Sequence, residues 1–432
     1  MTPSQPKAPG RSPVRRRRLL AVAAGAALAL TVSACGGGGR STAGSSDAPP
    51  QGVTTTEIKI GGSFPFSGPF AAFANSSKAV GAYFQAVNAA GGVNGRKITY
   101  TAADDAYDPS RLAANARKSV EQDKVAAFMS FGGTNVAIQP YMNESKVPQI
   151  VLAGNTEFSQ TTKFPYTHAW WPDLTWEAQY TTSYVLQRPA DFPSPKIGLI
   201  SLNNTLADSH IAGTVAALGP QAETVFPAAN RLKVEASLAD WTSQINQLRA
   251  AGVNVLYMNP GTAGQVNALK YIRQIGWPVQ VFLYSASGTI KQVLSPVGLQ
   301  ASTGFYTPAW LKDPADPRWA DDAGMKTYRE TLAKYGEGAD PDSAITANGY
   351  GSAQALVAAL KAIGTGEVTP DAINSAWLSI KAAPTDVLMP GSTLTAGPGG
   401  RLVTSYQMLR FDGTSWKDVA PLADVSALGI AK

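Results

Sequence analysis

The alternation of short apolar runs with amphipathic helical segments constrains the fold of this chain more than any other feature. Residues 58–64 alternate like a strand that enters a core, and Val80, Phe84 and Val87 then recur at helical spacing. The alternation continues to a loop rich in Trp and Pro at residues 168–172 and restarts after it. Strands that alternate with such helices form parallel sheets through crossover connections. The expected strands cover residues 58–64, 98–102, 125–129 and 149–152, and then 196–200, 253–257 and 279–283.

Two such runs predict an α/β fold with two doubly wound parallel-sheet lobes. The length of 432 residues agrees, because one domain usually holds roughly 100–200 residues. Asp108 followed by Pro109 predicts a helix start, since Asp caps a helix and Pro suits its first position. We expect further helices at residues 241–250 and 348–362, and a strand followed by a turn at 405–413.

The first 56 residues have a different character. Arg15 to Arg18 precede an uncharged run at residues 19–34, which is shorter than the ~20 residues that span a bilayer. A basic segment, an apolar run and small residues predict a signal peptide over residues 1–34. Cys35, the single cysteine, then stands where a bacterial lipoprotein signal places its lipidated cysteine. Residues 35–56, rich in Gly, Ser, Thr and Pro, predict a lipid-anchored flexible linker. The alternative is an ordinary signal peptide followed by an incidental cysteine.

The net charge of +6 belongs to this leader. Six of the 36 basic residues precede Cys35 and none of the 30 acidic residues does, so the remaining chain has 30 of each. No later basic cluster with interleaved aromatic residues indicates nucleic-acid binding.

The chain has few of the groups that catalysis requires. The two histidines, His168 and His210, lie far apart, and no His/Cys cluster has the spacing of metal ligands. Phosphate-loop and nucleophile-elbow motifs are missing from the sequence. Residues 208–210 read Asp-Ser-His, but members of a catalytic triad rarely lie so close in sequence. We therefore expect no enzyme activity, no metal and no cofactor.

Five segments, in their order and spacing, resemble the branched-chain amino acid-binding proteins of ABC transporters, the type I periplasmic binding proteins. The resemblance covers residues 57–415, and its most specific part is Asn88 to Asp108. The segments are Phe66-Ser-Gly-Pro, Asn88-Ala-Ala-Gly-Gly-Val-Asn-Gly-Arg-Lys-Ile, Asp104-Asp-Ala-Tyr-Asp-Pro, Ala114-Asn-Ala-Arg-Lys and Asp240-Trp-Thr-Ser-Gln-Ile.

The resemblance implies two lobes joined by three hinge crossings, with hinges near residues 170–172 and 304–306. The first lobe would comprise residues 57–170 and 305–395, and the second 171–304 and 396–432. Ligands of doubly wound sheets bind beyond the carboxyl ends of the strands, which here means between the lobes.

The resemblance also implies the site residues. In the first lobe they follow the third and fourth strands, where glycines and helix N-termini suit a ligand carboxylate, and Phe73 falls where the family has an aromatic wall. The alternative is that these residues only cap helices or pack. The expected first-lobe residues are Phe73, Gly132, Gly133, Thr134, Asn135, Gly154, Asn155 and Thr156.

The second lobe departs from the family pattern. Leu206 and Asp208 stand near the place of the usual Tyr-Gly pair, Pro260 and Gly261 follow another strand, and Ala286 lies where an acid usually holds the ligand ammonium. A buried ammonium needs a partner charge or strong acceptors. Unless Asp208 replaces the acid, we expect a ligand without an ammonium, such as an amide, a carboxylic acid or an aromatic compound.

The sequence therefore predicts an extracytoplasmic solute-binding lipoprotein of an ABC importer. It would capture a small molecule, which is an amino acid, an amide or a carboxylic or aromatic acid, between its two lobes by hinge closure. It would act as a monomer and deliver the ligand to an ABC permease, with the lipid at Cys35 as its membrane anchor. The alternatives are a ligand-sensing receptor domain of the same fold, a secreted hydrolase and, third, a structural surface protein.

Overall fold

The computed structural model describes residues 51–430 except 69, 236 and 260–262. The expected signal peptide, Cys35 and all but the last residues of the linker therefore lie outside the described residues, as do Pro260 and Gly261.

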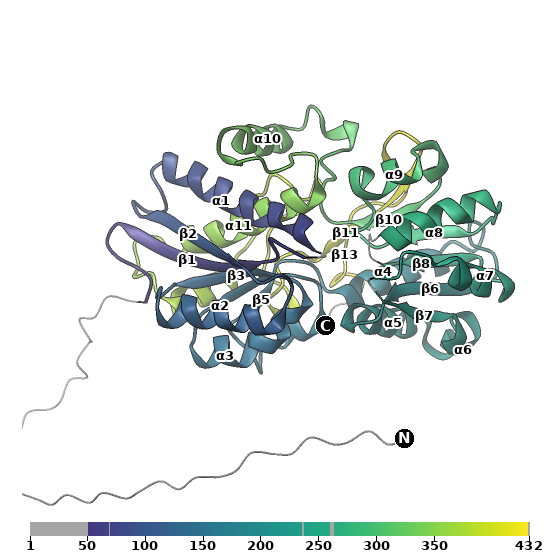
Figure 1. Ribbon diagram of the computed structural model, residues 1–432, viewed down its shortest axis with the longest axis horizontal. Coiled ribbons are helices and arrows are strands. Elements are labelled where there is room, and N and C mark those ends of the chain that lie inside the picture. The colour runs from purple at the N-terminus through teal and green to yellow at the C-terminus, as the bar shows by residue number, and fades with distance from the viewer. Residues whose placement is uncertain (1–50, 69, 236, 260–262, 431–432) are drawn as a thin grey trace, which may run out of the picture. The chain divides into compact units, whose positions relative to one another are not determined.

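The first lobe is built on a five-stranded, all-parallel sheet in the order β2-β1-β3-β4-β5 (Figure 1). Helices α10 and α11 come from much later in the chain but pack on α1, and α12 packs on α11. The strands are β1 (Glu57–Phe64), β2 (Lys97–Asp104), β3 (Ala127–Phe131), β4 (Gln149–Leu152) and β5 (Thr167–Ala169). The helices are α1 (Ala74–Ala89), α2 (Pro109–Glu121), α3 (Gln139–Glu144), α10 (Ala323–Tyr335), α11 (Ala344–Ala362) and α12 (Pro370–Trp377).

The second lobe holds a larger sheet in the order β12-β11-β10-β9-β8-β6-β7, with β13 paired to β11 (Figure 1). Strands β6 to β10 run parallel to one another. Strand β11 pairs in antiparallel fashion with β10 on one side and with β12 on the other. The strands are β6 (Ile197–Leu202), β7 (Arg231–Val234), β8 (Val255–Met258), β9 (Gln280–Leu283), β10 (Tyr306–Ala309), β11 (Ser405–Phe411), β12 (Trp416–Asp418) and β13 (Ala423–Asp424). The helices are α4 (Leu174–Leu186), α5 (Thr205–Leu218), α6 (Ala222–Val225), α7 (Thr242–Ala250), α8 (Ala263–Gln274) and α9 (Ser295–Val297).

The predicted fold class, two parallel-sheet α/β lobes, is confirmed by these two sheets and their helices. The chain passes between the lobes three times: after β5, after β10 and between α12 and β11. The second crossing lies after Ala309 and not at the expected residues 304–306, because β10 pairs with β9 and β11 inside the second sheet.

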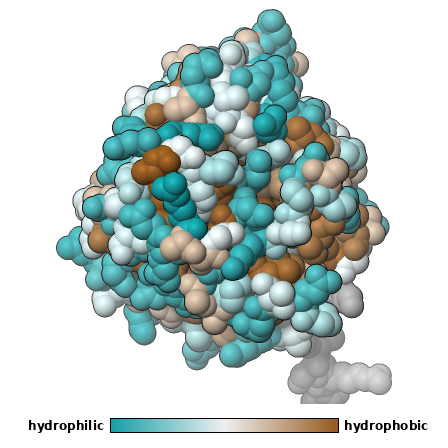
Figure 2. Space-filling view, turned by 90° about the vertical axis from the view of Figure 1, so that its right-hand side faces the viewer, coloured by the Kyte–Doolittle hydropathy of each residue, from teal (hydrophilic) through white to brown (hydrophobic). Residues whose placement is uncertain are grey.

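Local sequence accounts for the ends and faces of several helices. The Asp108 carboxylate accepts hydrogen bonds from two backbone amides in the first turn of α2, and Pro109 occupies the first helical position, as predicted. In α8 the buried residues, which include Ala268, Leu269 and Ile272, share one face. The opposite face of α8 meets water. Figure 2 shows the outer end of the second lobe, which lies on the right in Figure 1, and hydrophilic residues cover most of it. None of the helices in the described part of the chain has both the length and the apolar character that crossing a bilayer requires.

A buried ion pair ties the crossings together. Arg401, between α12 and β11, is fully buried, and its Nη2 lies 3.2 Å from Oδ2 of Asp173, which belongs to the first crossing. The same guanidinium donates to the backbone oxygens of Trp171 and Asn155 and to Oγ of Ser159. One side chain therefore joins the third crossing to the first crossing and to the loop after β4.

Candidate functional site

A cavity of about 830 Å³ lies between the two lobes. Its walls include loops at the carboxyl ends of strands: residues 132–134 follow β3, 153–155 follow β4, 204–206 follow β6 and 284–286 follow β9. Ligands of doubly wound sheets bind at this edge, and small-molecule sites usually measure ~300–1,000 Å³. The cavity is therefore the candidate functional site.

Most of the residues expected at the site line this cavity. Residues from both lobes meet there, as hinge closure on a ligand requires. They are Phe73, Gly132, Gly133, Thr134, Gly154, Asn155, Leu206 and Ala286.

Two expected residues of the first lobe do not line the cavity. The Asn135 side chain is buried and donates to two backbone oxygens of its own loop, each at 2.9 Å. The Thr156 hydroxyl donates to the Asp173 carboxylate at 2.9 Å. Both side chains hold loops and hinge segments in place behind the cavity.

Asp208, the candidate replacement for the missing acid, also lies outside the cavity lining. Its carboxylate is 63 % exposed and pairs with Lys233 at 2.5 Å. The neighbouring His210 is buried, its Nδ1 lies 3.0 Å from Nδ2 of Asn259, and burial lowers its pKa to about 3. Asp208, Ser209 and His210 therefore do not assemble as a catalytic triad.

The loop after β3 requires a glycine at position 132. Gly132 has a φ of +93°, and a Cβ there would lie 2.4 Å from a ring carbon of Tyr107. A side chain would be strained and would also displace the aromatic ring. On the loop after β4, the Asn155 amide donates to Oγ1 of Thr205, the first residue of α5, at 2.5 Å. This bond joins cavity residues of the two lobes.

Seven aromatic side chains line the cavity at the hinge side and over the first lobe. Phe73 stacks on Phe131 with ring centroids 3.8 Å apart, and Phe70 approaches Tyr107 at 4.3 Å. The ring of Trp171, on the first crossing, lies 6.3 Å from that of Phe131. We call this set the aromatic wall: Phe70, Phe73, Tyr107, Phe131, Trp171, Tyr284 and Trp310.

Sequence reasoning found only Phe73 of the aromatic wall. Phe131 is the last residue of a strand and has the pattern of an ordinary core residue, and Tyr284 directly follows another strand. The available signal was the pair Trp170-Trp171, because two large aromatic residues at an expected hinge lie next to the cleft.

The charged side chains that line the cavity already have partners. Lys312 Nζ lies 2.7 Å from Asp322, and Arg318 Nη1 lies 2.8 Å from Asp418. Asp313 accepts hydrogen bonds from two backbone amides, and burial raises its pKa to about 6. Among the described residues of the lining, no unpaired charge faces a ligand.

The resemblance implied an acid in the loop after β9. A carboxyl group does lie behind this loop, but it belongs to Glu177 of α4. Glu177 accepts hydrogen bonds from N and Oγ of Ser285, at 2.9 and 2.6 Å. Burial raises the pKa of Glu177 to about 8, so the carboxyl is mostly protonated at neutral pH. Only Ser285 reaches the cavity lining, and the site offers a hydroxyl there in place of a negative charge.

Glu177 predicts a pH dependence of stability. Its pKa is 4.5 when exposed and about 8 when folded, so the folded state binds more protons between these values and stability falls as pH rises. Above about pH 7.5 both histidines are almost entirely neutral in the folded and unfolded states, because their pKa is 6.5 when exposed and burial lowers it to about 4 for His168 and about 3 for His210. The decline from pH 7.5 to 8.5 should be about 0.7 kcal/mol, because one pKa unit corresponds to ~1.4 kcal/mol and Glu177 is on average half protonated over this range. It should be shallower in Glu177→Gln. Urea unfolding at the two pH values measures it, and equal declines in both proteins would contradict the assignment.

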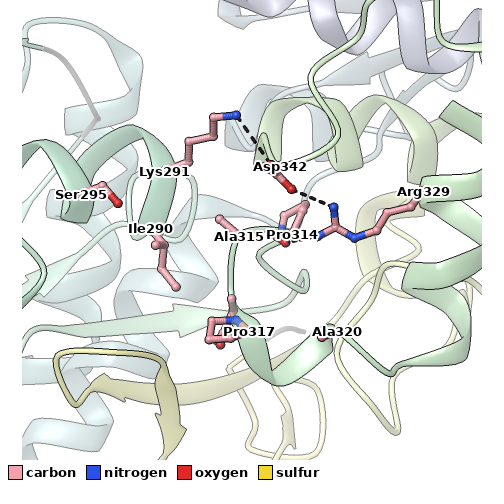
Figure 3. A pocket seen from close by; sticks show the side chains of 10 residues that line it. Ile290, Lys291, Ser295, Pro314, Ala315, Pro317, Ala320, Arg329 and Asp342 are labelled. Carbon is pink, nitrogen blue, oxygen red and sulfur yellow. Dashed lines mark hydrogen bonds and ion pairs between the residues drawn. The ribbon is translucent and has the colours of Figure 1, made fainter. Parts of the chain in front are cut away.

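A second, smaller cavity of about 340 Å³ lies beside residues 314–320, which follow the second crossing. Figure 3 shows Lys291 and Arg329 reaching toward Asp342, at 3.9 and 2.7 Å. The Asp342 carboxylate thus pairs with both of these partly exposed cations. In the described ranges no group of three or more His, Cys, Asp and Glu side chains could hold a metal ion. The larger cavity thus remains the candidate site.

Residues 57–415 match the sequence model of a family described as "Periplasmic binding protein". A curated relative, Leu/Ile/Val-binding protein homolog 1 of Brucella abortus (strain 2308), is 26 % identical over 326 residues, which cover 73 % of this chain and 81 % of the relative.

Solved structures share the fold. A branched-chain amino acid ABC transporter protein from Thermus thermophilus with bound valine has a TM-score of 0.74 at 17 % identity, covering 86 % of this chain and 97 % of that chain. A solute-binding protein of an ABC transporter from R. palustris in complex with benzoate has a TM-score of 0.67 at 16 % identity, covering 85 % and 98 %.

Proposed function

Because this chain belongs to the periplasmic binding protein family, we propose that it is the solute-binding component of an ABC importer and that its ligand is a carboxylic acid with an apolar or aromatic body. The observation that carries the ligand class is the aromatic wall combined with the lack of an unpaired carboxylate in the described lining. A zwitterionic amino acid would bury its ammonium without a partner charge, which is costly.

The two lobes offer complementary contacts for such an acid. Thr134 and Asn155 lie at the β3 and β4 loops, and Thr205 and Leu206 form the first turn of α5. The Leu206 amide donates to the side chain of the N-cap Asn204, and the Ala207 amide donates to the Asn204 backbone oxygen. The positive end of the α5 dipole nevertheless favours a carboxylate beside this first turn. The aromatic wall receives the apolar body. Contacts from both lobes favour the closed state, which is the form that a permease would recognise.

The ligands bound in the two related structures represent both classes, since one structure holds valine and the other benzoate. The choice between them for this chain rests on its own cavity. Benzoate shares with our proposed ligand an apolar ring and a carboxylate without an ammonium.

Matched ligands test the proposal by thermal shift of the purified protein. 3-Phenylpropanoate and L-phenylalanine have the same carboxylate and ring and differ by the ammonium; 4-methylpentanoate and L-leucine form an aliphatic pair. We expect the two acids without an ammonium to raise the melting temperature, with a stabilisation of ~2.7 kcal/mol at a hundredfold excess over Kd, and the amino acids to have much smaller effects. Stronger shifts by leucine or phenylalanine would refute the ligand class.

We further propose that the protein is exported and anchored by a lipid on Cys35. A lipid would keep a soluble binder beside its permease. Expression of Cys35→Ser in the native host should release the protein from the membrane fraction, and mass spectrometry should find a lipidated N-terminal cysteine in the native protein. An unmodified thiol at Cys35 in the mature protein would contradict the anchor.

A further inference from the structure

The cavity extends from the cleft into the second lobe, and this inner end has walls of its own. Thr307 on β10 faces the same side of the sheet as its pairing partner Leu409 on β11. Trp416 on β12 and Thr289, just before residues 290–294, complete the walls, and all four residues line the cavity. The inner end therefore lies beyond the aromatic wall, between β10 to β12 and the segment after β9.

Three buried polar atoms at this inner end have no hydrogen-bond partner among the described residues. They are Oγ1 of Thr289, Oγ1 of Thr307 and Nε1 of Trp416. The side chains are 4 %, 2 % and 1 % exposed, respectively. Buried polar groups are nearly always hydrogen-bonded, so three unpaired groups in one cavity need an explanation.

Position 288 requires a glycine because the Thr307 hydroxyl occupies the space that a Cβ would need there. A Cβ at Gly288 would lie 2.2 Å from Oγ1 of Thr307, so the glycine backbone passes directly beside this hydroxyl. Gly288 itself lines the cavity. The Thr307 hydroxyl therefore packs against the Gly288 backbone in the wall of the cavity.

We propose that Thr289, Thr307 and Trp416 form a second polar subsite, which recognises a hydroxyl or carbonyl group on the body of the bound acid. The proposal rests on the proposed function and narrows it from apolar acids to hydroxy or oxo acids. Trp416 Nε1 only donates, whereas the threonine hydroxyls donate or accept. A ligand hydroxyl can accept from Trp416 and donate to a threonine. A neutral group is expected, because Arg318 and Asp313 nearby already have partners.

The test compares acids that differ by one oxygen. Calorimetry would give the Kd of each acid in two pairs. The first pair is 3-phenylpropanoate and 3-(4-hydroxyphenyl)propanoate. The second pair is octanoate and 8-hydroxyoctanoate, whose longer chains reach deeper into the cavity. In at least one pair the hydroxylated acid should bind about tenfold more tightly. Thr289→Val and Thr307→Val, which keep the shape and remove the hydroxyl, should bring that ratio toward one.

Thr214→Val is the matched control. Thr214 is also fully buried with an unpartnered hydroxyl, but it lies on α5 outside the cavity lining. It should leave the ratio unchanged. Ratios near one in both pairs, or a preference that survives in both variants, would overturn the subsite while the proposed function stands. If none of the four acids binds, the proposed function fails and the subsite fails with it.

Discussion

Replacement of Arg401 by methionine is expected to lower the free energy of unfolding by about 3–5 kcal/mol. The guanidinium is fully buried and lies 3.2 Å from the buried carboxylate of Asp173. Methionine fills part of the volume but leaves Asp173 charged and unpaired, and it also leaves the backbone oxygens of Trp171 and Asn155 without their donor. Loss of one partner from a buried pair costs far more than the pair contributes relative to an apolar substitute.

Urea unfolding followed by tryptophan fluorescence measures this loss. Lys118→Met is the matched control, because Lys118 pairs with Asp123 at 2.7 Å on the surface, with side chains 56 % and 36 % exposed. Its effect should stay below about 1 kcal/mol. The double variant Arg401→Met with Asp173→Asn should recover part of the loss, since it removes the unpaired charge. A loss no larger than that of the control would show that the buried pair does not hold the crossings.

Replacement of Phe73 by alanine is expected to weaken the binding of 3-phenylpropanoate by about 10- to 100-fold, or about 1.4–2.8 kcal/mol. Phe73 lines the cavity and stacks on Phe131 with ring centroids 3.8 Å apart. Truncation removes one face of the aromatic wall and leaves space that the apolar body of the ligand cannot fill. Since Phe73 is only partly buried, the fold should tolerate the change.

The control is Phe66→Ala, which removes the same side chain from the loop after β1. Phe66 is 39 % exposed and is not part of the cavity lining. Isothermal titration calorimetry should give an unchanged Kd for this variant, and circular dichroism should show native spectra for both. Equal affinities for Phe73→Ala and the control would place the acid elsewhere than at the aromatic wall.

Much of the fold follows from local sequence patterns. Strands β1, β4 and β11 lie where apolar alternation or short apolar runs predict them, and α2 begins where Asp108 and Pro109 predict it. The strands β5, β7, β10, β12 and β13 escaped this reasoning. β10 contains Pro308, which cannot donate to its neighbour, and it is a strand only because β9 and β11 flank it. As a result the second crossing lies after Ala309.

The residues of the candidate site also fall into those that local sequence can place and those that it cannot. The loops after β3 and β4 can be placed from sequence, because the carboxyl ends of parallel strands meet at one edge. The inner subsite cannot be placed from sequence. Thr307 and Trp416 come from strands about a hundred residues apart, and the alignment of these strands depends on their antiparallel pairing with β11. Arg401 follows a glycine-rich turn, and nothing in its local sequence indicates that it is buried against Asp173.

The sequence by itself determined the alternation of strands and helices, the two lobes and the loops that reach the cleft, because these depend on periodicity and on the polarity of neighbouring residues. Only the tertiary structure decided that Asp208 pairs with Lys233 on the surface, that burial raises the pKa of Glu177 behind Ser285, and that the seven rings of the aromatic wall line one cavity together with Trp416. These features depend on contacts between segments far apart in the chain, where burial and pairing set the charge and direction of each side chain.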